Sequence, residues 1–281
     1  MNPVLSQLTD PKDEIDTRIH DEFMGMYMLS AVSRKQVEFK INAETAGRVY
    51  QLWLNAGICL LKANAHTRNF RKLLEEKKEE FTQEVSEANT GDKQHYYWDL
   101  SVEVEGMLTH LKAALDTFAI LIGTVTNQNI SGWSKKKPVG GDRTFSGQNI
   151  INILSRNLPA NELAQFKPLI DFLEDNKEHI SEIIKVRDGF THPHGSFTDL
   201  TTGFFYDSTE NKIIEPAVKF RNVGMLQSSF IDMAFNFTLE TLIYSGIGLL
   251  NGIAGGMVIQ YENGSYDWRI LQSALNTDQS S

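Results

Sequence analysis

The chain has 281 residues, of which 41% are hydrophobic and 22% are charged. This balance is typical of a globular protein and excludes both a disordered chain and a fibrous one. The formal net charge of −9 opposes long-range attraction of nucleic acid, because phosphate binding depends on clustered lysine and arginine. A chain of this length can bury a large core, so we expect one helical core with appendages.

The charge and apolarity of the N-terminal residues, together with the cysteine content, indicate the cellular compartment. The N-terminal residues lack a charged start followed by an apolar stretch, so they do not read as a secretory signal. Cys59 is the one cysteine, which excludes a disulfide within the chain and fits a reducing compartment. We therefore expect a cytoplasmic protein.

Residues 238–259 are the one stretch that resembles a membrane span. Glu240, Asn251 and several glycine, serine and alanine residues interrupt its apolar run, whereas a span needs about 20 predominantly apolar residues. We expect a buried core helix or a dimer-face helix here, in which the small residues allow close helix packing, and no membrane partner.

Apolar residues at three- and four-residue spacing predict helices along most of the chain. The first predicted helix begins near residue 43, and the others cover about 67–87, 94–123, 146–157, 161–174, 177–190 and 223–250. Residues 203–206 and 212–220 flank a turn at 207–211 and predict a β-hairpin, in which Pro216 suits an edge strand. Short strands are also expected at 36–41 and within 256–270.

These patterns predict a mainly α protein. Residues 1–41 form a partly irregular N-terminal extension, residues 42–255 form a helical bundle with a β-hairpin inserted at about 201–220, and residues 256–281 form a C-terminal tail. We find no internal repeat.

A cluster of basic residues occurs in the long loop predicted at about 124–141. Lys135, Lys136 and Lys137 follow Trp133, and Arg143 comes shortly after them. Lysines beside an aromatic side chain suit contact with nucleic acid, although a solvated loop shows the same pattern. The four basic residues are our candidates for substrate binding.

The segment with the clearest chemical character runs from Arg187 to His192, where a predicted helix ends before Pro193. Arg187 and His192 are five residues apart, and on a continuing helix they would lie near one another. Gly189 and the restriction on the residue before proline predict that the helix loosens around Phe190. The histidine would then be able to turn into a cleft while the arginine stays anchored.

This arrangement of an arginine, a polar residue and a later histidine resembles the active-site motif of HEPN domains. Arg187, Asp188 and His192 match the pattern, and residues 106–119 resemble the bundle helix that packs against the motif helix in such proteins. The resemblance covers about residues 94–250.

Several expectations are implied by the resemblance alone. The fold would be a helical bundle of HEPN type, and two copies would pair as a homodimer with one composite site. The protein would be a metal-independent endoribonuclease, or it would resemble the members of the family that have no catalytic activity. A toxin–antitoxin, phage-defence or stress-response setting is implied, with RNA as substrate and a protein antitoxin as a candidate partner.

The residue types in this segment suit metal-independent RNA cleavage. That reaction needs activation of the 2′-hydroxyl, stabilisation of charge at the phosphate and protonation of the leaving oxygen. His192 can exchange a proton near neutral pH, and Arg187 can hold phosphate oxygens. His194 is an alternative proton carrier, and Thr191 either donates to the phosphate or caps locally. Asp188 either orients an imidazole or Arg187, or makes a structural hydrogen bond.

A structural interpretation of the same residues stays open. A cation and a histidine at a helix C-terminus also satisfy terminal carbonyls, so Arg187 and His192 can be purely structural. The protein would then be a non-catalytic helical dimerisation or partner-binding protein, which the acidic net charge favours. His95, His110 and His179 are expected to be surface or core residues. No phosphate-binding loop, hydrolase elbow or zinc motif is found, so no cofactor is expected.

Overall fold

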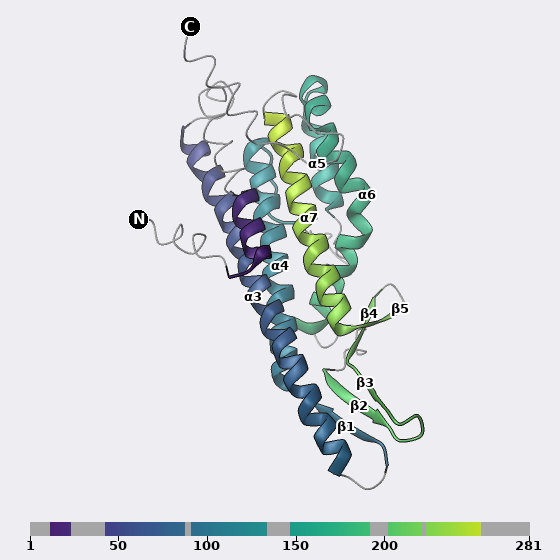
Figure 1. The fold of residues 1–281 in the computed structure, drawn as a ribbon. Helices are drawn as coiled ribbons and strands as arrows, with labels where there is room; N and C mark the ends of the chain where they lie inside the picture. The colour runs from purple at the N-terminus through teal and green to yellow at the C-terminus, as the bar shows by residue number, and fades with distance from the viewer. Residues whose placement is uncertain are drawn as a thin grey trace, which may run out of the picture. The chain divides into compact units, whose positions relative to one another are not determined.

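The computed structural model describes residues 12–23, 43–87, 91–133, 147–191, 202–220 and 223–253. These residues are mainly helical, with two small antiparallel sheets (Figure 1), which confirms the predicted mainly α class. Residues 14–23 are helical, and the later elements are α3 (Ala43–Glu87), β1 (Lys93–Tyr96), α4 (Trp98–Val125), α5 (Gln148–Asn157), α6 (Ala160–Thr191), β2 (Gly203–Asp207), β3 (Lys212–Ile214), β4 (Ala217–Phe220), β5 (Val223–Leu226) and α7 (Gln227–Ile253).

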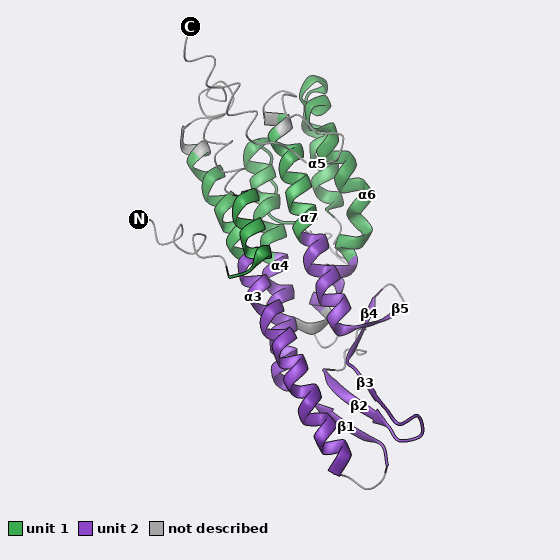
Figure 2. Ribbon diagram, in the orientation of Figure 1, with its two compact units in different colours: residues 1–60, 113–181, 239–281 green, residues 61–112, 182–238 purple. Residues whose placement is uncertain are grey.

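The chain divides into two compact units (Figure 2). Unit 1 consists of residues 1–60, 113–181 and 239–281, and unit 2 consists of residues 61–112 and 182–238. Helices α3, α4, α6 and α7 each contribute one part to unit 1 and another part to unit 2, because the boundaries fall within them.

An aromatic cluster around Trp53 fills the interior of unit 1. The Trp53 ring lies edge-on to Phe23, with centroids 6.2 Å apart, and to Phe118 at 5.5 Å, and all three side chains are fully buried. Phe23 and the equally buried Ile19 belong to helical residues 14–23. The sequence analysis predicted a partly irregular extension at residues 1–41 and did not identify this helix. Its two buried apolar positions lie one turn apart, which suffices once a core receives them.

Helix α3 is one continuous helix of 45 residues, whereas the sequence predicted a new helix from about residue 67. The Thr67 hydroxyl does not cap a helix start but donates to the carbonyl of Ala63 at 3.1 Å, inside the helix. Phe70 and Leu74 continue the buried face beyond this point. The predicted boundary was wrong because no glycine or proline interrupts the helix there.

Helix α6 is also continuous where the sequence predicted two helices, at about 161–174 and 177–190. At the predicted break, the Asn176 side-chain amide donates to the Phe172 carbonyl at 2.8 Å. An asparagine whose side chain bonds to the preceding turn is tolerated inside a helix. The predicted break between two helices was therefore wrong, because Asn176, a residue type common in turns, is helical here.

Strands β1 and β5 replace the starts of two predicted helices. The sequence predicted helices from about residues 94 and 223, but α4 begins at Trp98 and α7 at Gln227. Strand β1 pairs antiparallel with β2, and β5 pairs antiparallel with β4. These pairings involve partners that local helical spacing does not reveal, and they override the local preference.

The predicted β-hairpin is confirmed in its first half. Strands β2 and β3 pair antiparallel, with Phe205 opposite Ile214, and Asn211 closes the turn with φ of 52°. The Asp207 carboxylate accepts hydrogen bonds from the backbone N–H groups of Thr209 and Glu210, which is typical of an aspartate at the start of a turn. Residues 217–220 instead form β4 of a second hairpin, and Pro216 lies between β3 and β4.

Unit 2 has its own apolar core beside the sheet of β1, β2 and β3. The Phe204 ring stacks on Phe81 of α3, with centroids 5.8 Å apart, and both side chains are buried. The second hairpin contributes Phe220, whose ring lies 5.9 Å from that of Phe230 on α7. Both hairpins thus bury one face against a helix of the same unit.

Small residues let α7 pack closely on α6 within unit 1. A Cβ at Gly248 would lie 3.0 Å from the Cα of Leu169, and a Cβ at Gly252 would overlap the Phe166 ring. The Gly248 contact is with backbone, which cannot yield as a flexible side chain can. These contacts explain why glycine occupies both positions of an otherwise apolar helix.

Within the part of the chain that the structure describes, two helices are long and apolar enough to cross a membrane by length and composition alone. They lie in Trp98–Val125 and Gln227–Leu250, and 50% and 72% of their most apolar windows are buried within the protein. Core helices of soluble proteins meet the same criterion. The sequence predicted one such stretch, near α7, and missed the one in α4.

Replacing Gly248 with alanine is expected to destabilise the protein by about 1–3 kcal/mol, because a methyl group cannot enter the space beside the Leu169 backbone. Chemical denaturation of the variant measures this change. Gly47→Ala is the matched control, since Gly47 is also helical and nothing lies within 4 Å of its Cβ position. The control is expected to gain up to about 1 kcal/mol from helix propensity. A stabilised Gly248→Ala variant would contradict the close packing.

Candidate functional site

The predicted motif begins near the C-terminus of α6, in unit 2. The helix continues through Gly189 and ends at Thr191, one residue beyond the end predicted at about residue 190. A glycine within a helix costs only about 1 kcal/mol relative to alanine, and Gly189 does not end this one. His192 therefore follows directly after the last residue of a continuous helix.

Arg187 and Asp188 form an ion pair at this helix end. Arg187 Nη1 donates to Asp188 Oδ1 at 2.8 Å, and the two side chains are only 21% and 13% exposed. Ile183, Ile184 and Val186 are buried next to them on the same helix. An ion pair that is shielded from water is stronger and better fixed than one on the surface. The guanidinium therefore has a defined direction.

Most of the other predicted site residues cannot be compared with the structure. His192, His194, Lys135, Lys136, Lys137 and Arg143 lie outside the described residues, as does the side chain of Thr191. Their proposed roles therefore remain predictions.

Trp133 was considered as an aromatic neighbour of the three lysines, but it is fully buried. Its backbone N–H donates to Asp116 Oδ1 at 2.9 Å, and the Cβ position of Gly147 lies 3.0 Å from its Nε1. This tryptophan is part of the core of unit 1. It is therefore not available for stacking on a nucleic-acid base.

A second polar cluster in unit 2 joins α3 to α4. His66 Nδ1 lies 2.7 Å from Glu103 Oε2, and the His66 ring stacks on His110 with centroids 5.5 Å apart. The side chains of His66 and Glu103 are 30% and 16% exposed. A carboxylate oxygen accepts hydrogen bonds, so this contact has the form of an imidazole N–H donating to Glu103.

Gly106 makes room for this cluster. A Cβ at Gly106 would overlap the His66 imidazole, lying 2.6 Å from Nδ1. Glu103, Gly106 and His110 follow one another at three- and four-residue spacing, so they share a face of α4. The absence of a side chain at Gly106 therefore lets the His66 ring lie flat against this face and reach Glu103.

The pKa of His110 is lowered by the surroundings of its ring. Burial makes the largest contribution because it disfavours the charged imidazolium, and the nearby His66 and Lys62 add electrostatic repulsion. His110 is thus held neutral where an exposed histidine would begin to protonate. The cluster combines an imidazole bonded to a carboxylate with a neutral imidazole stacked on it.

The cluster was missed from the sequence, where His110 was expected to be a surface or core residue. The signal was the spacing of Glu103, Gly106 and His110 on one helix, facing Lys62 and His66 on another. No spacing rule within one helix reveals which second helix it meets. The arrangement does not have the form of a metal site. Among the described residues, no group of three or more His, Cys, Asp or Glu residues is arranged to hold a metal ion.

Comparison of the chain with protein-family models, with curated proteins and with solved structures found no match.

Gly106→Ala is expected to destabilise the protein by about 1–2 kcal/mol, because the methyl group displaces His66 and leaves the half-buried Glu103 without this partner. In a His66→Ala background the same change is expected to stabilise by up to about 1 kcal/mol, because alanine favours helix over glycine. Denaturation of the four proteins of this double-mutant cycle measures the coupling. Equal effects of Gly106→Ala in both backgrounds would contradict the proposed role of Gly106.

The lowered pKa of His110 predicts a specific loss of stability in acid. The unfolded chain takes up a proton near the ordinary histidine pKa of about 6.5, whereas the folded protein resists protonation. The contribution of neutral His110 to the free energy of unfolding is therefore fully present above about pH 6.5. It is lost as the pH falls from there toward the pKa of His110 in the folded protein. Denaturation measured between about pH 7.5 and pH 5 is expected to show a weaker pH dependence in His110→Gln than in the unmodified protein.

Lys62→Gln provides a second variant for this pH dependence. This variant removes one cause of the lowered pKa of His110. It should therefore reduce the loss of folding stability in acid, but by less than His110→Gln does. An unchanged pH dependence in His110→Gln would contradict this assignment.

Proposed function

We propose that this protein is a HEPN-like RNA-binding protein that cleaves RNA without a metal ion, through a composite active site in a cytoplasmic homodimer. The observation that best supports the proposal is the shielded Arg187–Asp188 ion pair near the end of the continuous helix α6. His192 follows five positions after Arg187 in the sequence. The HEPN type of the helical bundle is part of the proposal.

Arg187 is suited to hold the scissile phosphate. A guanidinium presents several N–H donors in one plane, so it can contact a carboxylate and phosphate oxygens at the same time. The Asp188 contact and the low exposure of both side chains fix the direction of the guanidinium before substrate arrives. A preorganised cation stabilises the charge that develops on the phosphate without having to reorient during the reaction.

His192 is proposed to move the protons. In a symmetric dimer, His192 of one subunit accepts the proton of the 2′-hydroxyl, and the partner's His192 protonates the leaving 5′-oxygen. The 2′-oxygen forms a bond to phosphorus as the bond to the 5′-oxygen breaks, so no metal ion or water is required in this step. His194 is the second candidate for either proton transfer, and Thr191 is a candidate donor to the phosphate.

RNA binding by an acidic protein requires local clusters of cations. We propose that Lys135, Lys136, Lys137 and Arg143 supply this charge, because they are close together in a chain whose net charge is −9. A toxin–antitoxin, phage-defence or stress-response role, with a protein antitoxin as partner, follows from the HEPN resemblance alone.

A non-catalytic partner-binding role is the second candidate, and exposed apolar residues favour it. Tyr96 and Trp98, at the junction of β1 and α4, are 59% and 81% exposed, and Val102 one turn later is 43% exposed. Exposed aromatic side chains are enriched at protein interfaces. In this alternative Arg187 and Asp188 stabilise the helix end and take no part in catalysis.

RNA cleavage by the purified protein in EDTA tests the proposal. The unmodified protein is expected to cut a mixture of RNAs, and His192→Ala is expected to lower the rate by about 100-fold to 10,000-fold, as loss of a proton-transfer group does. His20→Ala is the matched control, because His20 is partly exposed, lies outside the motif and contacts the adjacent Asp21. The control is expected to retain full activity.

Two outcomes would overturn the ribonuclease proposal. Equal cleavage by the unmodified protein and by His192→Ala would show that this histidine does not act in the reaction. The absence of cleavage by the homodimer across all RNAs would favour the partner-binding role.

A further inference from the structure

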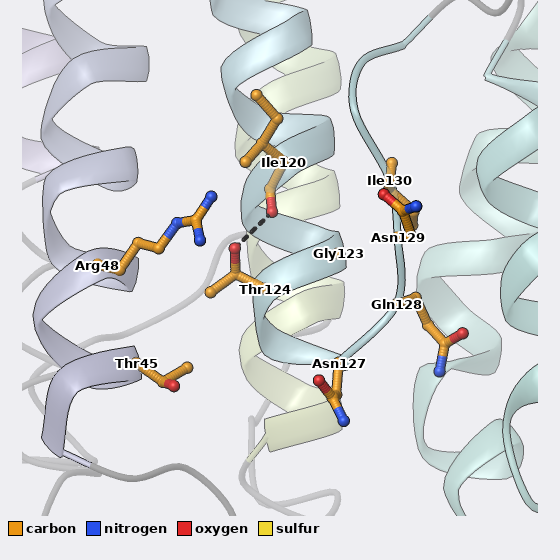
Figure 3. Close-up of a pocket in the computed structure, with 9 residues that line it drawn as sticks. All are labelled: Thr45, Arg48, Ile120, Gly123, Thr124, Asn127, Gln128, Asn129 and Ile130. Atoms are coloured by element: carbon orange, nitrogen blue, oxygen red, sulfur yellow. Dashed lines mark hydrogen bonds between the residues drawn. The ribbon is translucent and has the colours of Figure 1, made fainter.

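A cavity of about 610 Å³ lies in unit 1, between the first turns of α3 and the C-terminal end of α4 (Figure 3). Pockets that bind small organic ligands usually measure about 300–1,000 Å³, so this one has the capacity for such a ligand. None of the residues that line it belongs to the ribonuclease site proposed above. The inference drawn from it therefore goes beyond that function and does not depend on it.

Arg48 gives this cavity its charge. It is the one charged residue among the described residues of the lining, and its side chain extends from α3 toward Thr124 of α4 (Figure 3). The described side chains include no carboxylate that forms an ion pair with Arg48. An exposed guanidinium without such a carboxylate attracts an anion and can hold two of its oxygens at once.

The helix ends at the cavity are also compatible with an anion. Arg48 lies in the second turn of α3, near the helix end that carries partial positive charge. The cavity also meets the C-terminal end of α4, whose terminal carbonyls carry partial negative charge and would repel an anion. Two of these carbonyls already accept hydrogen bonds. The Ile122 carbonyl accepts from the Thr126 hydroxyl at 2.7 Å, and the Gly123 carbonyl accepts from the Gln128 backbone N–H at 2.8 Å.

The turn after α4 adds neutral hydrogen-bonding groups to the cavity. Asn127, with φ of 51°, and Asn129 are both exposed, and neither side chain bonds to another described residue. Gln128 between them is held in place, because its side-chain oxygen accepts from the Asn157 amide at 2.9 Å. A Cβ at Gly123 would lie 2.8 Å from the Gln128 carbonyl oxygen, so this turn can fold back over the helix only because Gly123 has no side chain.

The combination of groups indicates the chemical class of the ligand. A guanidinium suits a phosphate, and a carboxamide, which both donates and accepts, can pair with the polar edge of a nucleobase. Ile120 and Ile130 line the same cavity and offer apolar contact to the faces of a ring. We propose that the cavity binds a nucleoside monophosphate, with its phosphate on Arg48 and its base at Asn127 and Asn129.

Isothermal titration calorimetry of the full chain tests this site. The probes are AMP, GMP, CMP and UMP, with the corresponding nucleosides and inorganic phosphate for comparison. At least one nucleotide is expected to bind with one site per chain and at least tenfold more tightly than its nucleoside or inorganic phosphate, because both the cation and the amides contribute.

Three variants assign the contacts. Arg48→Gln is expected to weaken nucleotide binding at least tenfold. Asn129→Asp is expected to weaken it because a carboxylate cannot donate a hydrogen bond to the base and adds negative charge to the cavity. Both positions are exposed, so neither change should impair folding, which circular dichroism checks. Arg156→Gln is the matched control, because Arg156 is an exposed arginine of unit 1 that does not line the cavity. It is expected to bind the nucleotide as the unmodified protein does.

Several results would overturn the proposal. Absence of binding by all four nucleotides would exclude a nucleotide site, and equal binding by Arg48→Gln would place the nucleotide elsewhere. Binding of inorganic phosphate as tightly as the nucleotides would reduce the cavity to a simple anion site. None of these results depends on RNA cleavage, so this proposal and the ribonuclease proposal can fail separately.

Discussion

The close approach of α3 to α4 at Gly106 is the constraint on which the cluster of His66, Glu103 and His110 in unit 2 depends. A single missing side chain allows His66 to lie against α4, bond to Glu103 and stack on His110. Burial of the His110 ring at this contact, and then the nearby His66 and Lys62, disfavour protonation of His110 and lower its pKa. Stability, protonation and helix packing are therefore coupled at one point, and the coupling comes from shape as much as from charge.

Local charge, and not the net charge of −9, decides what this protein can bind. Arg187 and Arg48 show two ways to hold a cation for an anionic ligand. Arg187 is largely shielded and directed by the adjacent Asp188, which suits a guanidinium that has to be oriented for a reaction. Arg48 is exposed among neutral amides and hydroxyls, which suits reversible binding. The proposed ribonuclease chemistry and the proposed nucleotide site follow from this difference.

The sequence predicted the helical class, the approximate places of most helices and the β2–β3 hairpin, because the apolar stripes and turn residues that specify them are local. It did not predict β1, whose partner β2 lies about 110 residues further along the chain, or β5, which pairs with the adjacent β4. It also did not predict the helix at 14–23, which depends on Trp53 to receive Phe23. It also divided α3 and α6 at Thr67 and Asn176, whose side chains bond within the helix. The Arg187–His192 motif was evident from its spacing, whereas the His66 cluster and the cavity at Arg48 require the pairing of two helices.

Cleavage through the 2′-hydroxyl leaves a defined chemical signature on RNA, and mass spectrometry of the fragment ends reads it directly. Attack of the 2′-oxygen on phosphorus with loss of the 5′-oxygen gives a 2′,3′-cyclic phosphate on one fragment and a 5′-hydroxyl on the other. We expect these ends when RNA is incubated with the protein in EDTA. Fragments with 3′-hydroxyl and 5′-phosphate ends, or RNA that remains intact, would contradict the role proposed for Arg187 and His192.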